Sequence, residues 1–313
     1  RVQGNLEQEV QRRLRADIEV SLQDELNRFR SMPAWQRTLQ RFVRGKAMDE
    51  KGVIAHLLER KSIAVQALAS AGAGYWCTPF GEPEWIKIPA GEFWMGGDGE
   101  NDGKPIHCVR LDTYSIARVL ITNAQYYLFT KTTDYNIPKH WEEKRPPKGL
   151  ESHPVVNVSW HDTIAYCAWL SLKTGKYITL PSEAQWERAA RGNQDKRAYP
   201  WGEKFDFAKC NSYDRGLRTT TPVGIFSDGA SPDGCLDMAG NVLEWTRSRY
   251  KKYPYNANDG RENLETIEGE LRVLRGGSFG SNYNSVRCTC RGWNLPGFRD
   301  WGVGFRVVMS PGF

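Results

Sequence analysis

The residues of this chain that could do chemistry are seven cysteines, five histidines and a few acidic clusters. No Cys-x-x-Cys pair occurs, and an odd number of cysteines without regular spacing does not predict a disulfide framework. Cys288 and Cys290 are two residues apart, so on a strand both thiols would face the same side. The histidines lack metal-site spacing, and the acidic run at 98–103 lacks the flanking helices and the final glutamate of a calcium loop. No phosphate-binding or dinucleotide fingerprint is present.

The C-terminal segment, residues 272–313, is the best candidate for a working surface. Two strand-like ends, 271–274 and 303–308, bracket a long stretch of Gly, Ser, Asn, Pro and aromatic residues without helical or strand periodicity. A long loop of this kind in a folded domain is usually functional, because a rigid frame holds its ends while its side chains stay accessible.

Residues 1–70 are expected to form a small helical module. Apolar residues repeat every four residues from Leu6 to Leu26, which is typical of an amphipathic helix, and Met32-Pro33 ends it. The module has more apolar surface than it can bury alone, so we expect it to form a homo-oligomer or to join an upstream domain. Its 13 basic and 9 acidic side chains favour a solvated helical face over a nucleic-acid surface.

A small-residue linker over residues 71–84 leads into a domain over residues 85–313. Short strand patterns, Gly, Pro and many of the twelve Trp residues indicate an α+β domain with short helices between long loops. The predicted helices begin at Asn123, Trp160 and Ser182. Thr122 is a candidate cap for the first helix, and Ser159 and Asp162 have capping-box spacing at the second.

Six motifs of this domain, in order between Trp85 and Met309, resemble the successive signatures of the formylglycine-generating-enzyme (sulfatase-modifying factor) family. They are 88–97, 154–162, 180–192, 199–202, 237–246, and 275–278 with 304–307. The resemblance implies an elaborated C-type-lectin-like fold, of the formylglycine-generating-enzyme subtype and the α+β class. Residues 1–70 lie outside the resemblance.

The resemblance makes an enzyme one hypothesis. The oxidase of the family activates oxygen with copper held by two cysteines, and soft thiolates suit Cu(I). The matching positions hold Ser281 and Val286, which cannot bind copper, so we expect no catalytic residues. The alternative is an oxygen-dependent modifying enzyme that uses Cys288 and Cys290 as a displaced copper pair. Buried, inert thiols are the simpler expectation for these two residues.

The same segment is similar to the variable proteins of diversity-generating retroelements. In that family, Arg-Gly-Gly-Ser and a final Gly-Phe-Arg-Val enclose a mosaic of Asn, Ser, Tyr and Gly, whose codons are altered at adenines during reverse transcription. The chain has this order from Arg275 to Val307. The resemblance implies a bacterial protein with a hypervariable, ligand-binding region over residues 279–302.

Aromatic side chains give such surfaces rigid contact area, and Ser, Gly and Asn adapt to the ligand. We therefore expect a diversified binding protein whose partner is a protein or another macromolecule. The residues expected to face the ligand are Phe279, Gly280, Ser281, Tyr283, Asn284, Thr289, Gly292, Trp293, Asn294, Leu295, Gly297, Phe298, Asp300, Trp301 and Gly302. Trp293 and Trp301 are expected to be fixed anchors, because no asparagine codon yields tryptophan by changes at adenine. A binding module without diversification is a third hypothesis.

The resemblance also implies structural calcium, although binding itself would require no cofactor. The first set of oxygen ligands would be Asn211, Ser212 and Asp214 with a carbonyl near Leu217, and the second would be Asp237 with backbone oxygens of Met238, Gly240 and Val242. The spacing of the first set is shortened in this chain, whereas the second set keeps its motif. Glu244 and Arg275 are expected to make buried polar contacts that support the loop.

No apolar run is long enough to span a membrane, and no signal peptide is visible. The sequence begins with Arg1 in place of Met, so we expect it to be part of a longer protein. These features, with the modest net charge of +6, lead us to expect a cytoplasmic protein that binds no nucleic acid and does not span a membrane.

Overall fold

The fold is taken from a computed structural model that describes residues 81–97, 103–133 and 135–309. The helical module predicted for residues 1–70 lies outside the described residues, as does most of the predicted linker. The strands are β1 (Trp85–Ile88), β2 (Gly91–Met95), β3 (His107–Leu111), β4 (Tyr114–Ala117), β5 (Ile178–Thr179), β6 (Leu243–Arg249), β7 (Arg272–Arg275), β8 (Arg291–Asn294), β9 (Val303–Gly304) and β10 (Val308–Met309). The helices are α4 (Asn123–Thr133), α5 (Trp160–Thr174) and α6 (Glu183–Arg191), with 3-10 turns η1 (Phe207–Lys209), η2 (Tyr213–Arg215) and η3 (Ser227–Gly229).

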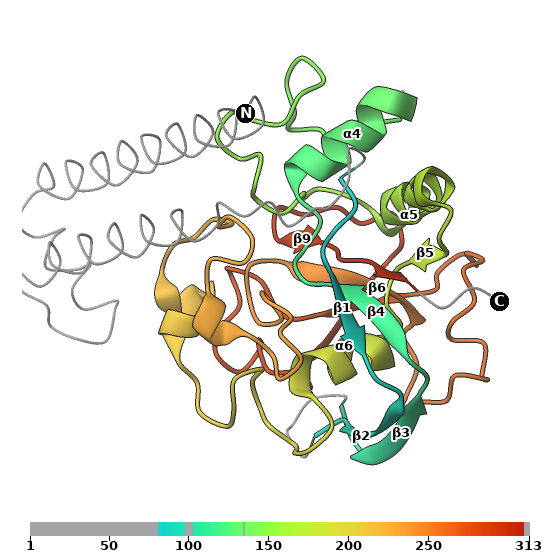
Figure 1. The fold of residues 1–313 in the computed structure, drawn as a ribbon, viewed down its shortest axis with the longest axis vertical. Helices are drawn as coiled ribbons and strands as arrows, with labels where there is room; N and C mark the ends of the chain where they lie inside the picture. Colours follow the sequence, from blue (N-terminus) through green and yellow to red (C-terminus); the bar gives the residue numbers. More distant parts are fainter. Residues whose placement is uncertain (1–80, 98–102, 134, 310–313) are drawn as a thin grey trace, which may run out of the picture. The chain divides into compact units, whose positions relative to one another are not determined.

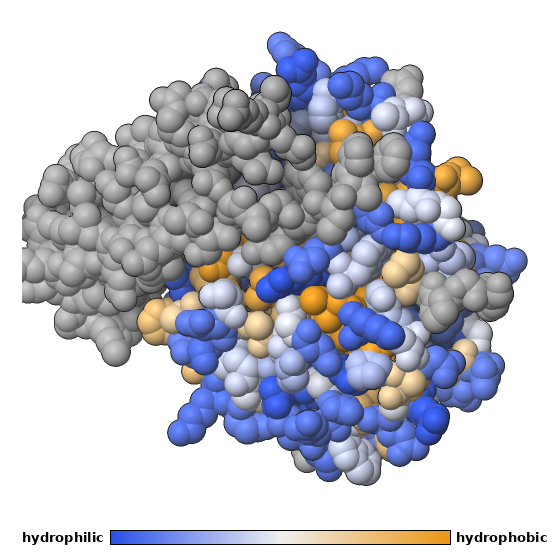
Figure 2. Space-filling view, viewed as in Figure 1, coloured by the Kyte–Doolittle hydropathy of each residue, from blue (hydrophilic) through white to orange (hydrophobic). Residues whose placement is uncertain are grey.

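Two four-stranded sheets and one hairpin organise the described residues. The first sheet has the order β1-β4-β10-β5, the hairpin pairs β2 with β3, and the second sheet has the order β8-β7-β6-β9. Strand β9 runs parallel to β6, whereas the other pairs are antiparallel. Figure 1 shows α4 and α5 toward one end of the fold and the β2–β3 hairpin toward the other, and α6 packs against this hairpin, β6 and β7. Figure 2 shows hydrophilic residues over most of the described face, with hydrophobic residues in small separate areas.

The helices begin where local side chains can cap them. The predicted capping box is confirmed: Ser159 Oγ accepts a hydrogen bond from the Asp162 amide (3.3 Å), and Asp162 Oδ2 accepts one from the Ser159 amide (2.7 Å). At α4, Thr122 Oγ1 likewise accepts from the Gln125 amide (3.2 Å). These bonds satisfy amides that have no partner inside the helix, so the sequence specifies each start locally.

Two buried tryptophans join α5 to the second sheet. The Trp160 indole donates to the carbonyl oxygen of Thr246 in β6 (3.0 Å), and the Trp245 indole donates to the carbonyl oxygen of Val158 before α5 (3.0 Å). Both side chains are fully buried in the largest core cluster, where Tyr166 packs among other aromatic rings. These two tryptophans thus do much of the packing between α5 and the second sheet.

Three details differ from the sequence-based expectation. The stretch predicted to lack strands contains β8, and the single strand-like end at 303–308 is split into β9 and β10. The end of the predicted linker is packed against the domain, because the Gln125 side-chain amide donates to Gly81 O (2.7 Å) and Glu82 pairs with Lys176 (2.5 Å). The folded domain therefore begins before residue 85.

His153 gives the domain a pH-dependent stability. Its imidazole is buried, Nδ1 lies 2.9 Å from Thr220 Oγ1, and burial lowers its pKa to about 3. An unfolded chain takes up this proton near pH 6.5, so the folded state loses stability as pH falls through this range. We expect His153→Gln, which is neutral throughout, to lose about 2 kcal/mol less than the natural chain between pH 7 and pH 5. Urea unfolding at both pH values measures the difference, and equal losses in both proteins would contradict the assignment.

Candidate functional site

A buried charge network lies under the C-terminal loop. Glu187 of α6 accepts a hydrogen bond from Arg275 Nη2, and Arg275 also donates to the carbonyl oxygens of Cys288 (2.7 Å) and Thr289 (3.3 Å). Glu183, one turn earlier, pairs with Arg291 of β8 (2.6 Å). These carboxylates and Arg275 are fully buried, so each charge depends on its partner. The expectation that Arg275 supports the loop is confirmed.

A second buried pair holds the end of the loop. Arg306 follows β9 and donates to both carboxylate oxygens of Glu244 in β6, at 2.6 Å and 2.9 Å. Its guanidinium also donates to the carbonyl oxygens of Leu236 (3.0 Å) and Asp237 (3.3 Å). Arg306 and Glu244 are fully buried. The expectation that Glu244 makes buried polar contacts is therefore confirmed, and both ends of the loop start from rigid charged anchors.

Residues 279–302, called the loop surface below, are held mainly through their main chain. The Phe279 amide donates to the carbonyl oxygen of Asn241 (2.9 Å). Donors from the framework bond to the carbonyl oxygens of seven loop residues, namely Ser281, Tyr283, Cys288, Thr289, Pro296, Asp300 and Gly302. Side-chain anchors are the pairs of Arg291 with Glu183 and of Arg299 with Asp162 (2.8 Å), together with Ser281 Oγ, which accepts a hydrogen bond from the Ser278 amide (2.9 Å). Neither arginine is among the residues predicted to face a ligand.

Most of the predicted ligand-facing residues reach the surface. The largest exposed side chains are Trp301 (59%), Trp293 (50%), Leu295 (49%) and Tyr283 (44%). Gly280, Asn284, Gly297 and Asp300 are also exposed, and Phe279, Ser281, Thr289, Gly292, Asn294 and Phe298 are half-buried. The prediction that Gly302 faces the ligand is wrong, because Gly302 is buried. Its amide donates to Asp300 Oδ1 (2.8 Å), and a β-carbon there would lie 3.2 Å from Ser278 Cβ.

The structure brings only part of this set together. The contact of Ser278 with Gly302 joins the start of the loop surface to its end, so Phe279 and Trp301 each lie next to this junction. Thr289 lies elsewhere, beside the β2–β3 hairpin, where a β-carbon on Gly97 would be 3.2 Å from its Oγ1. Trp293 stands on β8 and contacts the ring of Tyr250 (5.9 Å between centroids).

Framework residues that the sequence did not indicate border the loop surface. Tyr213, half exposed, donates its amide to the Ser281 carbonyl oxygen (2.8 Å), and the Arg218 guanidinium lies 3.3 Å from the centre of its ring. Tyr283 contacts Phe205 (5.9 Å between ring centroids). The His140 ring lies 4.8 Å from the ring of Trp301. These neighbours are distant in sequence, so composition and local spacing carried no signal for them.

The residues considered for copper binding, Ser281, Val286, Cys288 and Cys290, all lie in the loop surface. Ser281 Oγ accepts a hydrogen bond from the Ser278 amide (2.9 Å), and Val286 is fully buried. Cys288 lies in a turn that the hydrogen bond from the Cys290 amide to the Arg287 carbonyl oxygen closes (3.0 Å), so the two thiols do not stand on a strand. Cys288 is fully buried, which raises its thiol pKa to about 12, and burial also raises the pKa of the half-buried Cys290. Both thiols are free and protonated at neutral pH.

The two sets of calcium ligands differ in how well they suit a cation. In the first set Asn211 Oδ1 is buried without a hydrogen-bond partner among the described residues, and Asp214 is exposed on η2. In the second set Asp237 Oδ2 accepts from the Gly224 amide (2.6 Å), and burial raises the pKa of this carboxyl to about 6. Oxygen atoms are the ligands that calcium prefers, so the first set fits a hard cation through an oxygen that otherwise has no donor.

Comparison with known proteins places this geometry in a family. Residues 78–311 match the sulfatase-modifying factor enzyme 1-like domain. The chain is 34% identical over 245 residues to the serine/threonine-protein kinase Pkn1 of Chlamydia trachomatis serovar L2, covering 72% of this chain and 38% of that protein. It is 30% identical over 287 residues to the formylglycine-generating enzyme of Streptomyces coelicolor, covering 71% of this chain and 88% of that enzyme. The chain thus spans well under half the length of the kinase relatives.

A solved structure supports the fold. Variable protein 1 of Treponema denticola superposes with a TM-score of 0.61 and 23% identity, covering 72% of this chain and 95% of that one. At this identity the likeness shows the fold alone. The expected α+β, C-type-lectin-like fold of the formylglycine-generating-enzyme subtype is therefore confirmed. Within the described residues, no helix is both long and apolar enough to cross a membrane.

Proposed function

Because the chain belongs to the sulfatase-modifying factor enzyme 1-like domain family, we propose that its loop surface, residues 279–302, binds a macromolecular ligand and is diversified between copies of the gene. Trp293 and Trp301 act as fixed aromatic anchors, and the smaller exposed residues adapt to the ligand. No residue of the loop surface has a catalytic role in this proposal. The partner is a protein or another macromolecule, and not a nucleic acid.

The main-chain anchoring of the loop surface is the observation that carries this proposal. The framework bonds to carbonyl oxygens of the loop, and a carbonyl oxygen is present whatever the side chain is. Exchange of a side chain at Tyr283 or Asp300 therefore leaves the bond to the framework in place. A surface built in this way tolerates many sequences on one backbone, which is what a diversified binder needs. The fold likeness to a variable protein agrees with this reading.

Sequencing the DNA near the gene tests diversification. We expect a near-copy of the segment that encodes residues 272–308, beside a reverse transcriptase gene, differing from the coding copy only where the near-copy has adenine. The differences should fall on codons of exposed loop residues and spare Arg275, Arg291 and Arg299, whose side chains hold the loop. Absence of both repeat and polymerase in the complete genome would sink the proposal.

Exposed loop residues are expected to contribute little to stability. The double variant Tyr283→Ala with Trp301→Ala should lower the free energy of unfolding by less than about 1 kcal/mol, because both side chains are half exposed. Val286→Ala lies in the same segment but is fully buried, and it should cost about 2 kcal/mol. Urea unfolding compares them. A double variant that is less stable than Val286→Ala would show that the loop side chains hold the fold.

Copper binding separates this proposal from the enzyme alternative, in which Cys288 and Cys290 hold copper. The buried Cys288 thiol must lose a proton that burial retains, so we expect no stoichiometric Cu(I) binding at neutral pH. Titration of the reduced protein with Cu(I) and a competing chelator measures it. Tight binding of one Cu(I) that Cys290→Ser abolishes would favour the oxidase.

Structural calcium is part of the proposal at the first ligand set. CaCl₂ should raise the melting temperature relative to a chelator, because bound cation stabilises the folded state by mass action. Asp214→Asn should reduce the shift, and it should leave the fold intact because Asp214 is exposed. No shift with calcium, or an equal shift with magnesium, would rule out a calcium site.

We also propose a role for residues 1–70 and a location for the protein. Residues 1–70 would form a helical module that makes a homo-oligomer or joins an upstream domain. The protein would act in the cytoplasm, and the six cysteines that the structure describes are all free, as is typical of a reducing compartment.

A further inference from the structure

A basic pocket lies between α4 and the segment that follows it, and none of its lining residues belongs to the loop surface. It has a volume of about 570 Å³, which is within the usual range of roughly 300–1,000 Å³ for small-molecule sites. Lys131 of α4, and Lys144 and Arg145 of the following loop, bring three cationic side chains to it. Glu143 is the one acidic side chain among the lining residues that the structure describes, so their formal charge is +2.

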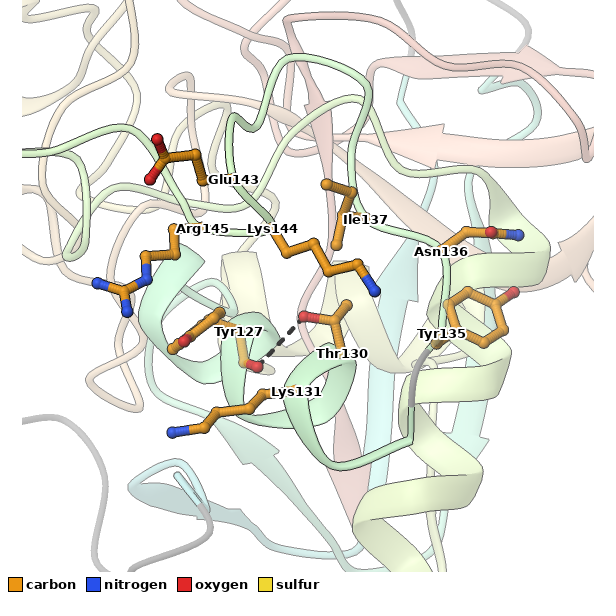
Figure 3. A pocket seen from close by; sticks show the side chains of 9 residues that line it. All are labelled: Tyr127, Thr130, Lys131, Tyr135, Asn136, Ile137, Glu143, Lys144 and Arg145. Atoms are coloured by element: carbon orange, nitrogen blue, oxygen red, sulfur yellow. Dashed lines mark hydrogen bonds between the residues drawn. The ribbon is translucent and has the colours of Figure 1, made fainter.

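The cations surround the pocket from different elements. Figure 3 shows the Lys144 ammonium extending toward Thr130, whereas the Lys131 and Arg145 side chains lie on the side of Tyr127. Lys131 Nζ is 5.8 Å from the centre of the Tyr127 ring. An anion between α4 and the loop would therefore meet positive charge on more than one side, with a half-buried aromatic ring beside it.

The loop that carries two of these cations has an unusual turn. The Arg145 amide donates to the Glu142 carbonyl oxygen (2.8 Å), and the two central residues, Glu143 and Lys144, have φ angles of 48° and 58°. Glycine or asparagine normally takes such left-handed positions in a tight turn, because a β-carbon is unfavourable there. Residues with long charged side chains hold both positions here, and the side chains of Lys144 and Arg145 leave the turn in different directions along the pocket (Figure 3).

The opposite wall is fixed by contacts outside the pocket. The Tyr135 hydroxyl donates to Asp162 Oδ1 (3.1 Å), and Asp162 is held by the start of α5 and by Arg299. Burial raises the pKa of Tyr135 to about 12, so this ring stays neutral beside an anion. Ile137 adds a half-buried apolar side chain to the same lining. The wall therefore offers ring and aliphatic surface, whereas the loop offers charge.

We propose that this pocket binds a small organic anion, a phosphate or sulfate ester carried on a ring, with the ester on Lys131 and Arg145 and the ring against Tyr127, Tyr135 and Ile137. Arginine and lysine are the side chains that recognise such tetrahedral anions, and the apolar wall distinguishes an ester from the inorganic ion. The ligand of this pocket is distinct from that of the loop surface, although Tyr135 of the pocket wall and Arg299 of the loop surface share Asp162 as their acceptor.

Calorimetric titration of the full chain with phenyl phosphate and phenyl sulfate, in a buffer free of other polyvalent anions, tests the proposal. We expect saturable binding of at least one ester that weakens as NaCl is raised, at least five-fold weaker binding of inorganic phosphate, and no binding of phenol. The double variant Lys131→Gln with Arg145→Gln should weaken ester binding at least ten-fold.

A matched control separates the pocket from general surface charge. The double variant Lys139→Gln with Lys148→Gln removes two exposed lysines of the same loop that do not line the pocket. It should change ester binding less than two-fold. Equal weakening in both double variants, failure of both esters to bind, or inorganic phosphate binding as tightly as an ester would each overturn the proposal.

Discussion

Replacing Glu187 by alanine is expected to lower the free energy of unfolding by about 3–5 kcal/mol, the largest loss for a single side chain near the loop. Glu187 Oε1 accepts hydrogen bonds from Arg191 Nη1 (2.9 Å) and the Gly96 amide (2.7 Å), and Oε2 accepts from Arg275. The substitution leaves two buried guanidinium groups without this carboxylate. Chemical denaturation measures the loss of stability.

Hydrogen exchange is a second measurement on Glu187→Ala, because it shows which residues lose protection. Arg275 donates to the carbonyl oxygens of Cys288 and Thr289, so residues 287–290 should lose protection from hydrogen exchange first. Glu84→Ala is the matched control, because Glu84 pairs with Arg118 (2.9 Å) at the surface and its loss should cost at most about 1 kcal/mol. A cost for Glu187→Ala no larger than that of the control would show that the buried network is not a support.

Replacing Arg306 by methionine should have an effect of similar size, about 3–5 kcal/mol, for a related reason. The methionine fills much of the same space but leaves Glu244 as a buried, unpaired carboxylate, and it removes the donors to Leu236 O and Asp237 O. Thermal and urea unfolding measure the change. The loss should be greatest at neutral pH and should shrink as the pH falls toward the ordinary pKa of a carboxyl, because Glu244 without its partner must either stay ionised in the core or take up a proton that an exposed carboxyl would have released.

The double variant Arg306→Met with Glu244→Leu distinguishes a charge effect from a packing effect. With both charges gone, no unpaired ion remains, so we expect the double variant to be more stable than Arg306→Met alone. The packing and carbonyl contacts of Arg306 are lost in both variants, so a double variant less stable than the single one would mean that the unpaired Glu244 carboxylate costs less than the loss of its own contacts.

The sequence predicted those parts of the fold that local chemistry determines. The starts of α4 and α5 were predictable because Thr122, Ser159 and Asp162 bond to amides within three residues of themselves. Strand β8 was not, because its four residues include Gly292 and Asn294 and show no alternation, and its register depends on pairing with β7. Tertiary pairing, and not propensity, makes this segment a strand.

The candidate site was also predictable only where local sequence determines it. Composition and order along the chain located the loop surface and its exposed aromatic residues, including Tyr283 and Trp301. They could not show that Gly302 is buried against Ser278 or that Thr289 lies beside the β2–β3 hairpin, because these are contacts between distant segments. Tyr213, which borders the loop surface through the carbonyl oxygen of Ser281, was missed for the same reason.

The carboxylate of Asp162 receives three different donors: the Ser159 amide that begins α5, the Tyr135 hydroxyl of the pocket wall, and the guanidinium of Arg299 in the loop surface. Substitutions at positions 135 and 299 therefore share one acceptor, and their energetic effects should not add. When either the Tyr135 hydroxyl or the Arg299 guanidinium is lost, the other becomes more important, because it still donates to the carboxylate oxygens of Asp162. Among relatives of this domain that diverged over long times, residues 135 and 299 should accordingly co-vary, whereas copies diversified within one genome should keep Arg299.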